Sequence, residues 1–198
     1  RYSKEYKVLN TDIYFYTMDV ITCCACRHQN INLNPMNVLC LSIDHLAEGG
    51  SVYNCMDHYF NTEELDGDYT CDKCKNKERN TITRSILTLP NVIIISLKRF
   101  AYDQRTHRMR KINNQVGYPM TLDITKYNPI TPSDSKPALY TLVGTVNHRG
   151  TLDFGHYYSY IKSDDRWYLA NDMHISHVDE SHALNNPSAY ILFYERIN

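Results

Sequence analysis

The sequence has little glycine or proline, no long apolar run and almost no net charge. Seven Gly and seven Pro among 198 residues exclude a collagen-like fibre and a low-complexity linker protein. The longest apolar run, Val92 to Ile95, is far shorter than the roughly 18 residues of a membrane-spanning helix. A formal net charge of -1 argues against a broad surface for nucleic acid or membrane lipids. The chain therefore has the composition of a globular protein of one or two domains.

An even cysteine count and a secretory signal are also missing. Four of the seven cysteines form two CxxC pairs, Cys23/Cys26 and Cys71/Cys74. This pattern favours metal binding over disulfides, and hence an intracellular, reducing compartment, the cytoplasm or the nucleus. Because the chain begins with Arg1 rather than Met, we expect a processed product or a piece of a longer protein.

The two CxxC pairs predict one structural zinc ion. Zinc prefers four tetrahedral sulfur or nitrogen ligands, and each CxxC turn can present two thiolates to one ion. The expected ligands are Cys23, Cys26, Cys71 and Cys74. Since 44 residues separate the pairs, the ion would join two distant hairpins. The alternatives are four reduced cysteines without metal, or a redox dithiol, although neither pair has the strand-to-helix setting of such a dithiol.

The other three cysteines have different contexts. Cys24 could compete with Cys23 as a ligand, although CxxC is the usual spacing of a metal-binding turn. Cys40 and Cys55 lie in apolar segments, NVLCLSI and VYNCMDHYF, and we expect both to be small core residues.

Strand-like runs dominate the second half of the chain. They cover residues Leu89–Phe100, Tyr140–Val146, His156–Lys162 and Ala189–Ile197. The apolar stretch within the first predicts a strand buried on both faces. Helix signals are few: Ser51 can cap a short helix to about Phe60, and Asp179 or Ser181 a brief turn. The basic segment Lys98–Lys111 is expected to be a solvated hairpin. The chain is therefore mostly β, with a metal-tied subdomain preceding a larger sheet.

One of the nine histidines has a chemical context. His156 lies in FGHYYSY, where a glycine leads into a strand beside a flexible loop. About ten residues later, RWYLAND offers Asn171 and Asp172 on a neighbouring antiparallel strand. A histidine with an Asn or Asp orienting its far nitrogen is two-thirds of a cysteine-protease triad.

The chain resembles the C-terminal two-thirds of the catalytic domain of the ubiquitin-specific proteases, which are papain-like deubiquitinases. Motifs in that family's order run almost from end to end: ITCCAC, NCMDHYFNTEELDGDYTCDKC, LPNVIIISLKRF, VGYPMTLDI, YTLVGTVNHRGTLDFGHYYSYIK, RWYLAND and AYILFYERI. The resemblance implies an α+β, mostly antiparallel β fold. Its zinc-tied β fingers would occupy residues 1–85 and its β-sheet palm residues 86–198.

The resemblance also implies roles for particular residues. His156 would be the general base, Asn171 its orienting partner and Asp172 the adjacent polar residue. Ubiquitin or a ubiquitinated protein would be the partner, with the loop Thr151–Gly155 flanking the channel for the ubiquitin tail. The residues expected to contact this substrate are Gly155, Tyr157, Glu64 and Asp66. The last two belong to an acidic run with Glu63 and Asp68, whose alternative interpretation is a solvated turn.

The family's nucleophile is missing. Its N-terminal cysteine box, an Asn-Thr-Cys segment in a Gly-rich context, is not found, and neither is the thumb that carries it. We expect the chain alone to be inactive and the parent protein to hydrolyse isopeptide or peptide bonds after the C-terminal Gly of ubiquitin by thiol catalysis.

Three alternatives stay open. The chain could be a non-catalytic ubiquitin-binding or scaffold domain, which has no need of His156 together with Asn171. A zinc-dependent nucleic-acid module needs a basic face, which the net charge disfavours. His148, in NHRG, could be a second catalytic base or a structural residue at a strand end.

Overall fold

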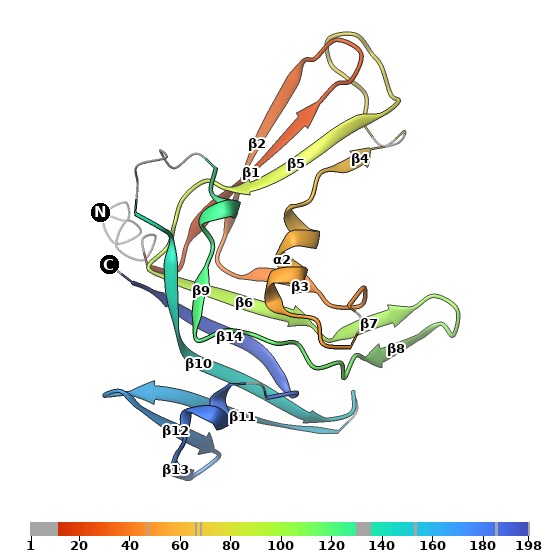
Figure 1. Ribbon diagram of the computed structural model, residues 1–198. Coiled ribbons are helices and arrows are strands. Elements are labelled where there is room, and N and C mark those ends of the chain that lie inside the picture. Colours follow the sequence, from red (N-terminus) through yellow and green to blue (C-terminus); the bar gives the residue numbers. More distant parts are fainter. Residues whose placement is uncertain are drawn as a thin grey trace, which may run out of the picture.

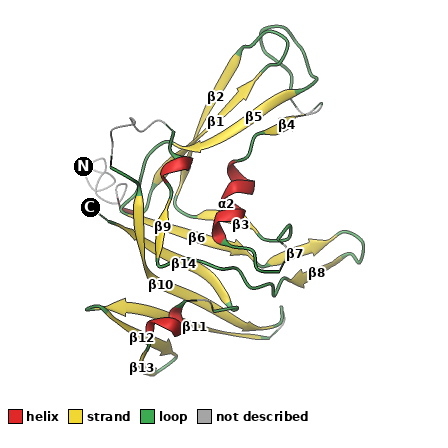
Figure 2. Cartoon of the chain, in the orientation of Figure 1, coloured by secondary structure: helices red, strands yellow, loops and turns green. Residues whose placement is uncertain are grey.

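The computed structural model describes residues 12–46, 48–65, 67, 69–129, 136–152, 154–184 and 186–197. These residues form a four-stranded sheet, an eight-stranded sheet and a two-stranded hairpin (Figure 1). Helices are short and few (Figure 2). No helix in these ranges is long and apolar enough to cross a membrane. The expected α+β, mostly antiparallel β class is confirmed.

The four-stranded sheet is antiparallel, in the order β2-β1-β5-β4. Its strands are β1 (Phe15–Thr22), β2 (Gln29–Met36), β4 (Glu63–Leu65) and β5 (Asn80–Ile86). Strands β1 and β2 pair over their full length, which places Val20 opposite Ile31 and Met18 opposite Leu33. Because side chains alternate between the faces of a sheet, these four apolar residues share one face.

The eight-stranded sheet carries most of the second half of the chain. Its main path is β13-β12-β11-β10-β14-β6-β3, and β9 pairs with β10. The strands are β3 (Leu39–Ser42), β6 (Val92–Lys98), β9 (Thr121–Asp123), β10 (Leu139–Gly150), β11 (Gly155–Ser163), β12 (Arg166–Asn171), β13 (His174–Val178) and β14 (Ala189–Arg196). All pairs are antiparallel except β3 with β6. The hairpin β7 (Phe100–Asp103) and β8 (Arg108–Lys111) follows β6.

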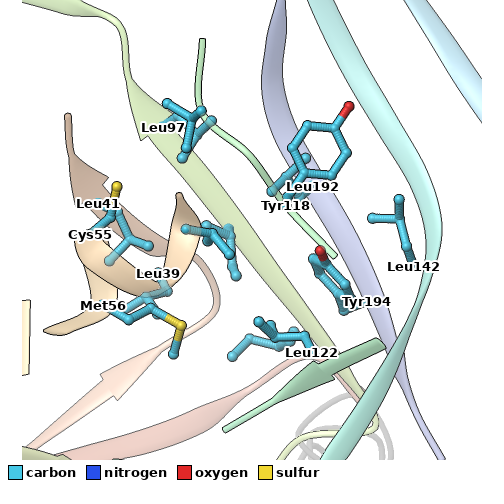
Figure 3. Packing of buried hydrophobic residues seen from close by; sticks show 14 of the residues in the cluster. Leu39, Leu41, Cys55, Met56, Leu97, Tyr118, Leu122, Leu142, Leu192 and Tyr194 are labelled. Atoms are coloured by element: carbon cyan, nitrogen blue, oxygen red, sulfur yellow. The ribbon is translucent and has the colours of Figure 1, made fainter. Parts of the chain in front are cut away.

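Helix α2 (Val52–Phe60) covers one face of the larger sheet. Ser51 caps it, as the sequence predicts, and completes a capping box with the Asn54 side chain. Cys55 and Met56 of the helix belong to one apolar cluster with buried residues of β3, β6, β10 and β14 (Figure 3). Two short helical segments complete the fold, η1 (Thr125–Tyr127) and α3 (Glu180–Ala183). The last of these lies at the turn predicted near Asp179.

Helix α2 and β3 belong to the first 85 residues but pack with the larger sheet. Only β1, β2, β4 and β5 form the separate sheet, and β5 ends at Ile86. The subdomain boundary between residues 85 and 86 stays a prediction.

The burial expected for strand β6 and for Cys40 differs from the structure. In β6 the burial alternates: Ile93 and Ile95 are fully buried, whereas Val92 and Ile94 are half-buried, so the strand is not buried on both faces. Cys55 is buried as predicted, but Cys40 is exposed because it points away from the core face that its neighbours in β3 occupy. An apolar segment predicts a strand, but not which of its residues face outward.

The basic segment Lys98–Lys111 does form a hairpin, but Arg99 is not solvated. Its side chain is 1% exposed and donates hydrogen bonds to the backbone carbonyls of Ala189 (2.6 Å), Ile112 (3.0 Å) and Asn114 (2.9 Å). The planar guanidinium can reach several acceptors at once, so it joins β14 to the segment after β8 from inside the core.

Candidate functional site

The two CxxC pairs meet at the end of the four-stranded sheet that lies away from the eight-stranded sheet (Figure 1). Cys23 and Cys26 occupy the turn between β1 and β2, and Cys71 and Cys74 the connection between β4 and β5. Two segments distant in the sequence are thus brought together, as the spacing predicts.

The two turns have the same backbone hydrogen bonds. The amides of Cys23 and Cys71 each donate to the carbonyl five residues later, at 2.9 Å. The amides of Arg27 and Lys75 donate back to the carbonyls of Cys23 and Cys71, also at 2.9 Å. Arg27 and Lys75 both adopt left-handed backbone, with φ of 59° and 61°. The sequence therefore builds the same turn twice, once for each half of the site.

The spacing of the four sulfurs fits one tetrahedral ion. Each Sγ lies within 4.8 Å of the others; the Cys23–Cys74 distance is 3.5 Å and the Cys26–Cys71 distance is 3.7 Å. A tetrahedron with zinc–sulfur bonds of about 2.3 Å has edges of about 3.8 Å. This donor set, four thiolates in closed tetrahedral geometry, suits zinc in a structural role.

Crowding drives the thiol pKa values apart. Hydrogen bonds from the backbone amides of Cys26 and Ala25 lower the pKa of Cys23 to about 6. For Cys74, the backbone amide of Asn76 lowers the pKa, but the neighbouring thiols and desolvation outweigh it and raise the value to about 12. Cys23 therefore loses its proton at a lower pH than Cys74, and the negative charge on one sulfur disfavours ionisation of the other. A bound divalent cation would offset this repulsion between thiolates.

Cys24 points away from the four sulfurs. Its Sγ donates to the carbonyl of Glu78 at 3.2 Å, and the Asn76 side-chain amide donates to that carbonyl at 2.7 Å. The same amide lies 3.9 Å from the Cys23 sulfur and 3.8 Å from the Cys24 sulfur, so Asn76 is a neighbour of the cysteine cluster that sequence reasoning missed.

His156 and Asn171 come together in the larger sheet. His156 is the second residue of β11, and Asn171 is the last residue of the adjacent strand β12. Asn171 Oδ1 lies 2.5 Å from His156 Nε2. Because an amide oxygen only accepts, this bond places the proton on Nε2 and leaves a lone pair on Nδ1. The His156 side chain is 49% exposed, so an incoming group can reach the ring.

Asp172 is next to this pair but more distant. Its Oδ2 lies 3.9 Å from His156 Nε2, and its side chain is 76% exposed. It begins the turn from β12 to β13 with a φ of 52°. At this distance the carboxylate makes no direct hydrogen bond to the ring, but a single water can bridge the two.

Sequence reasoning missed an aromatic group that includes Tyr157, the residue after His156 in β11. We use this name for Phe100, His148, Tyr157 and Tyr190, whose rings lie in a chain of contacts from 4.6 to 6.3 Å. His148, opposite Tyr157 in the strand register, is 4% exposed, and burial together with the nearby Lys111 lowers its pKa. All four lie in the motifs quoted above, but their proximity depends on long-range strand pairing.

The other residues predicted to contact substrate fall in different places. Tyr157 is 52% exposed, and Gly155 begins β11 directly before His156. Glu64 is exposed on β4 of the other sheet, opposite Thr81. Asp66 and Asp68, and Asp153 of the loop before Gly155, lie outside the described residues.

Gly155 fits a space that no larger residue can occupy. A Cβ at this position would collide with the His148 imidazole and lie 3.0 Å from the Arg149 carbonyl oxygen. We expect Gly155→Ala to lower the free energy of unfolding by about 1–3 kcal/mol, as overpacking does, and to displace His156. Urea denaturation measures the first effect. Gly117→Ala is the matched control, because its Cβ would meet atoms only at 3.7 Å and beyond. Equal stability of the two variants would contradict this prediction.

No cysteine of the chain lies beside His156. Four are in the cluster of Cys23, Cys26, Cys71 and Cys74, Cys24 adjoins that cluster, and Cys55 is a buried residue of α2. Cys40 lies on β3, four strand positions across the sheet from β11, a separation of about 19 Å at ordinary strand spacing.

A family model described as ubiquitin carboxyl-terminal hydrolase matches residues 3–194. The chain is 36% identical over 155 residues to "Ubiquitin carboxyl-terminal hydrolase 5" of Arabidopsis thaliana, covering 76% of this chain and 16% of that protein. It is 34% identical over 178 residues to "Probable ubiquitin carboxyl-terminal hydrolase 8" of Schizosaccharomyces pombe, covering 89% of this chain and 36% of that protein. The chain thus spans well under half the length of these relatives.

Among solved structures, the chain is similar to the "SAGA Ubp8/Sgf11/Sus1/Sgf73 DUB module bound to ubiquitin aldehyde". The TM-score is 0.87 at 26% identity, over 96% of this chain and 43% of the matched chain. A second structure, "the Ubp8-Sgf11-Sgf73-Sus1 SAGA DUB module", gives 0.80 at 25% identity, over 96% of this chain and 41% of the other.

Proposed function

Because the chain belongs to the ubiquitin carboxyl-terminal hydrolase family, we propose that it supplies the general base and part of the ubiquitin-holding surface of a thiol deubiquitinase. The observation that carries this proposal is the pairing of His156 with Asn171 at the ends of adjacent strands. A solved relative bound to ubiquitin aldehyde supports ubiquitin as the partner. The nucleophilic cysteine would come from a segment outside these 198 residues, since none of the seven cysteines lies beside the imidazole.

In this mechanism the lone pair on Nδ1 of His156 takes the proton from the incoming thiol. The thiolate attacks the carbonyl carbon of the C-terminal Gly of ubiquitin, forming a thioester as the carbon–nitrogen bond breaks. The imidazolium returns its proton to the departing amine, and water then hydrolyses the thioester with His156 again as base. Asn171 holds the ring in orientation throughout, and Asp172, 3.9 Å from the same ring nitrogen, supports that orientation through water.

We also propose one structural zinc ion bound by Cys23, Cys26, Cys71 and Cys74. The ion would join the β1–β2 turn to the β4–β5 connection and so fix the end of the four-stranded sheet. Four thiolate ligands fit a reducing compartment, cytoplasm or nucleus. Within this proposal the four-stranded sheet forms zinc-tied fingers and the larger sheet the palm, with Gly155, Tyr157, Glu64 and Asp66 as substrate contacts.

Titration of isotope-labelled ubiquitin with the purified chain tests the binding part of the proposal. We expect concentration-dependent changes in the ubiquitin amide resonances, because the holding surface does not require the nucleophile. A charge change on the smaller sheet, Glu64→Lys, should weaken the interaction, and most strongly at low salt. The matched control is Glu195→Lys, an exposed glutamate of β14. Unchanged ubiquitin spectra at millimolar protein would contradict the proposal.

A further inference from the structure

Strand β2 is an unprotected edge of the four-stranded sheet. Among the described residues it pairs only with β1, so alternate residues along its other side direct amides and carbonyls away from the sheet. An open edge of this kind is a template for another strand.

Proteins usually protect such an edge with charge, a bulge or a short strand, and β2 has none of these over most of its length. Its eight residues, QNINLNPM, include no charged side chain, and its register with β1 is continuous. The single interruption is Pro35, near one end. The opposite edge of the same sheet is a contrast, because β4 has three residues of which two are glutamate. The sheet is therefore protected on one edge and open on the other.

The open edge also carries exposed apolar side chains. Ile31 is 56% exposed and Leu33 is 54% exposed, and both lie on the face shared with Val20 and Met18. The opposite face of β2 carries the amides of Asn30, Asn32 and Asn34. One more strand at this edge would cover the apolar pair and satisfy the outward backbone groups.

We propose that β2 pairs with β2 of a second copy of this chain, antiparallel and centred on Asn32. In that register Ile31 of each copy lies opposite Leu33 of the other, and Asn30 lies opposite Asn34. When two identical strands pair, each side chain lies opposite a side chain from the same strand of the other copy. Like charges in opposite positions would destabilise such a pair. Because β2 is uncharged, self-pairing meets no such repulsion. The two copies then share a continuous eight-stranded sheet around a two-fold axis.

A second copy of β2 fits this edge better than an unrelated charged peptide, because β2 carries no charged side chain. No side chain of β2 can form an ion pair with a partner, so recognition rests on backbone bonds and the matched Ile31–Leu33 contacts. The larger sheet ends in another open edge, β13, whose five residues include two histidines. That edge borders Asn171, which makes it the alternative contact for the test to exclude.

Sedimentation equilibrium of the full 198-residue chain, loaded with zinc, tests the proposal over a range of concentrations. We expect a monomer–dimer equilibrium. The double variant Ile31→Lys with Leu33→Lys places like charges opposite each other and should weaken dimerisation about tenfold or more. The double variant Ile31→Lys with Leu33→Glu places opposite charges together in the Asn32-centred register, so it should dimerise again, with an affinity that falls as salt increases.

Both substituted positions are more than half exposed, so the variants should fold; circular dichroism and zinc content verify this. Ile175→Lys on β13, at a residue that is 73% exposed, is the matched control and should leave the dimer unchanged. Three outcomes would overturn the proposal: a monomer at all concentrations, dissociation caused by Ile175→Lys, or failure of the Lys/Glu variant to dimerise. None of these bears on hydrolase activity, so the proposal is tested separately from the function above.

Discussion

Removal of zinc from the purified chain is expected to unfold the four-stranded sheet and leave the eight-stranded sheet folded. The four cysteines of the proposed metal site lie at the end of the smaller sheet, in the CxxC turns that connect its strands. Structural zinc in small fingers has an apparent binding free energy of about 10–16 kcal/mol at neutral pH, comparable with the whole stability of a typical domain. The apolar core is built mostly from the larger sheet and α2, and takes Phe15 and Ile86 from β1 and β5 of the smaller sheet. Helix α2 and β3 should therefore remain ordered although they lie within the first 85 residues.

Hydrogen exchange before and after chelation measures this difference directly. Amides of β1 and β5 should lose protection, and those of β10 and β14 should keep it. Cys74→Ser should reproduce the effect of chelation, whereas Cys40→Ser, at an exposed cysteine away from the metal site, serves as the control. Folded, reduced protein that contains no zinc by elemental analysis would refute the metal assignment.

Replacement of His156 by alanine is expected to abolish most turnover once the chain is joined to the segment that carries the nucleophile. A positioned general base contributes about a hundred- to ten-thousand-fold to rate, and a thiol without one stays mostly protonated near pH 7. Asn171→Ala should cost less, because Asp172 lies 3.9 Å from the ring and can hold it through water. The 198-residue chain alone should show no turnover.

Hydrolysis of a fluorogenic ubiquitin substrate measures these rates. His177→Ala is a suitable control, since His177 is exposed on β13 of the same sheet and contacts only the edge of a tyrosine ring in the described structure. A ubiquitin-based electrophile should label the added segment and none of the seven cysteines of this chain. Labelling of any of the seven would mean that the nucleophile had been assigned to the wrong place.

Local patterns in the sequence predicted the strands and the candidate sites well. The spacing within each CxxC pair defines a turn, and the alternation around His156 defines a strand, because both depend on residues close in sequence. The structure brings the four cysteines to within 4.8 Å and places Asn171 against His156, both as expected. Their roles as metal ligands and catalytic residues stay predictions.

Features that depend on long-range contacts could not be predicted in this way. Arg99 is an ordinary basic residue in the sequence, and only the folding of β14 and the segment after β8 around it supplies its three carbonyl acceptors. The aromatic group has the same origin, since Phe100, His148 and Tyr190 come from three separate segments. Cys40 was misjudged because an apolar run does not indicate which face of a strand is covered.

The order of strands in the larger sheet affects how the protein can be made on the ribosome. Strand β14, the last in the sequence, lies between β10 and β6 and is hydrogen-bonded to both. Strands β3 and β6 therefore leave the ribosome well before β14. Until β14 has been synthesised, the edge of β6 that pairs with it stays open and the apolar core of the sheet is incomplete. An incomplete sheet exposes both hydrophobic surface and unpaired strand edges, the features that chaperones recognise in nascent chains. The position of this one strand thus delays completion of the larger sheet until β14 has been synthesised.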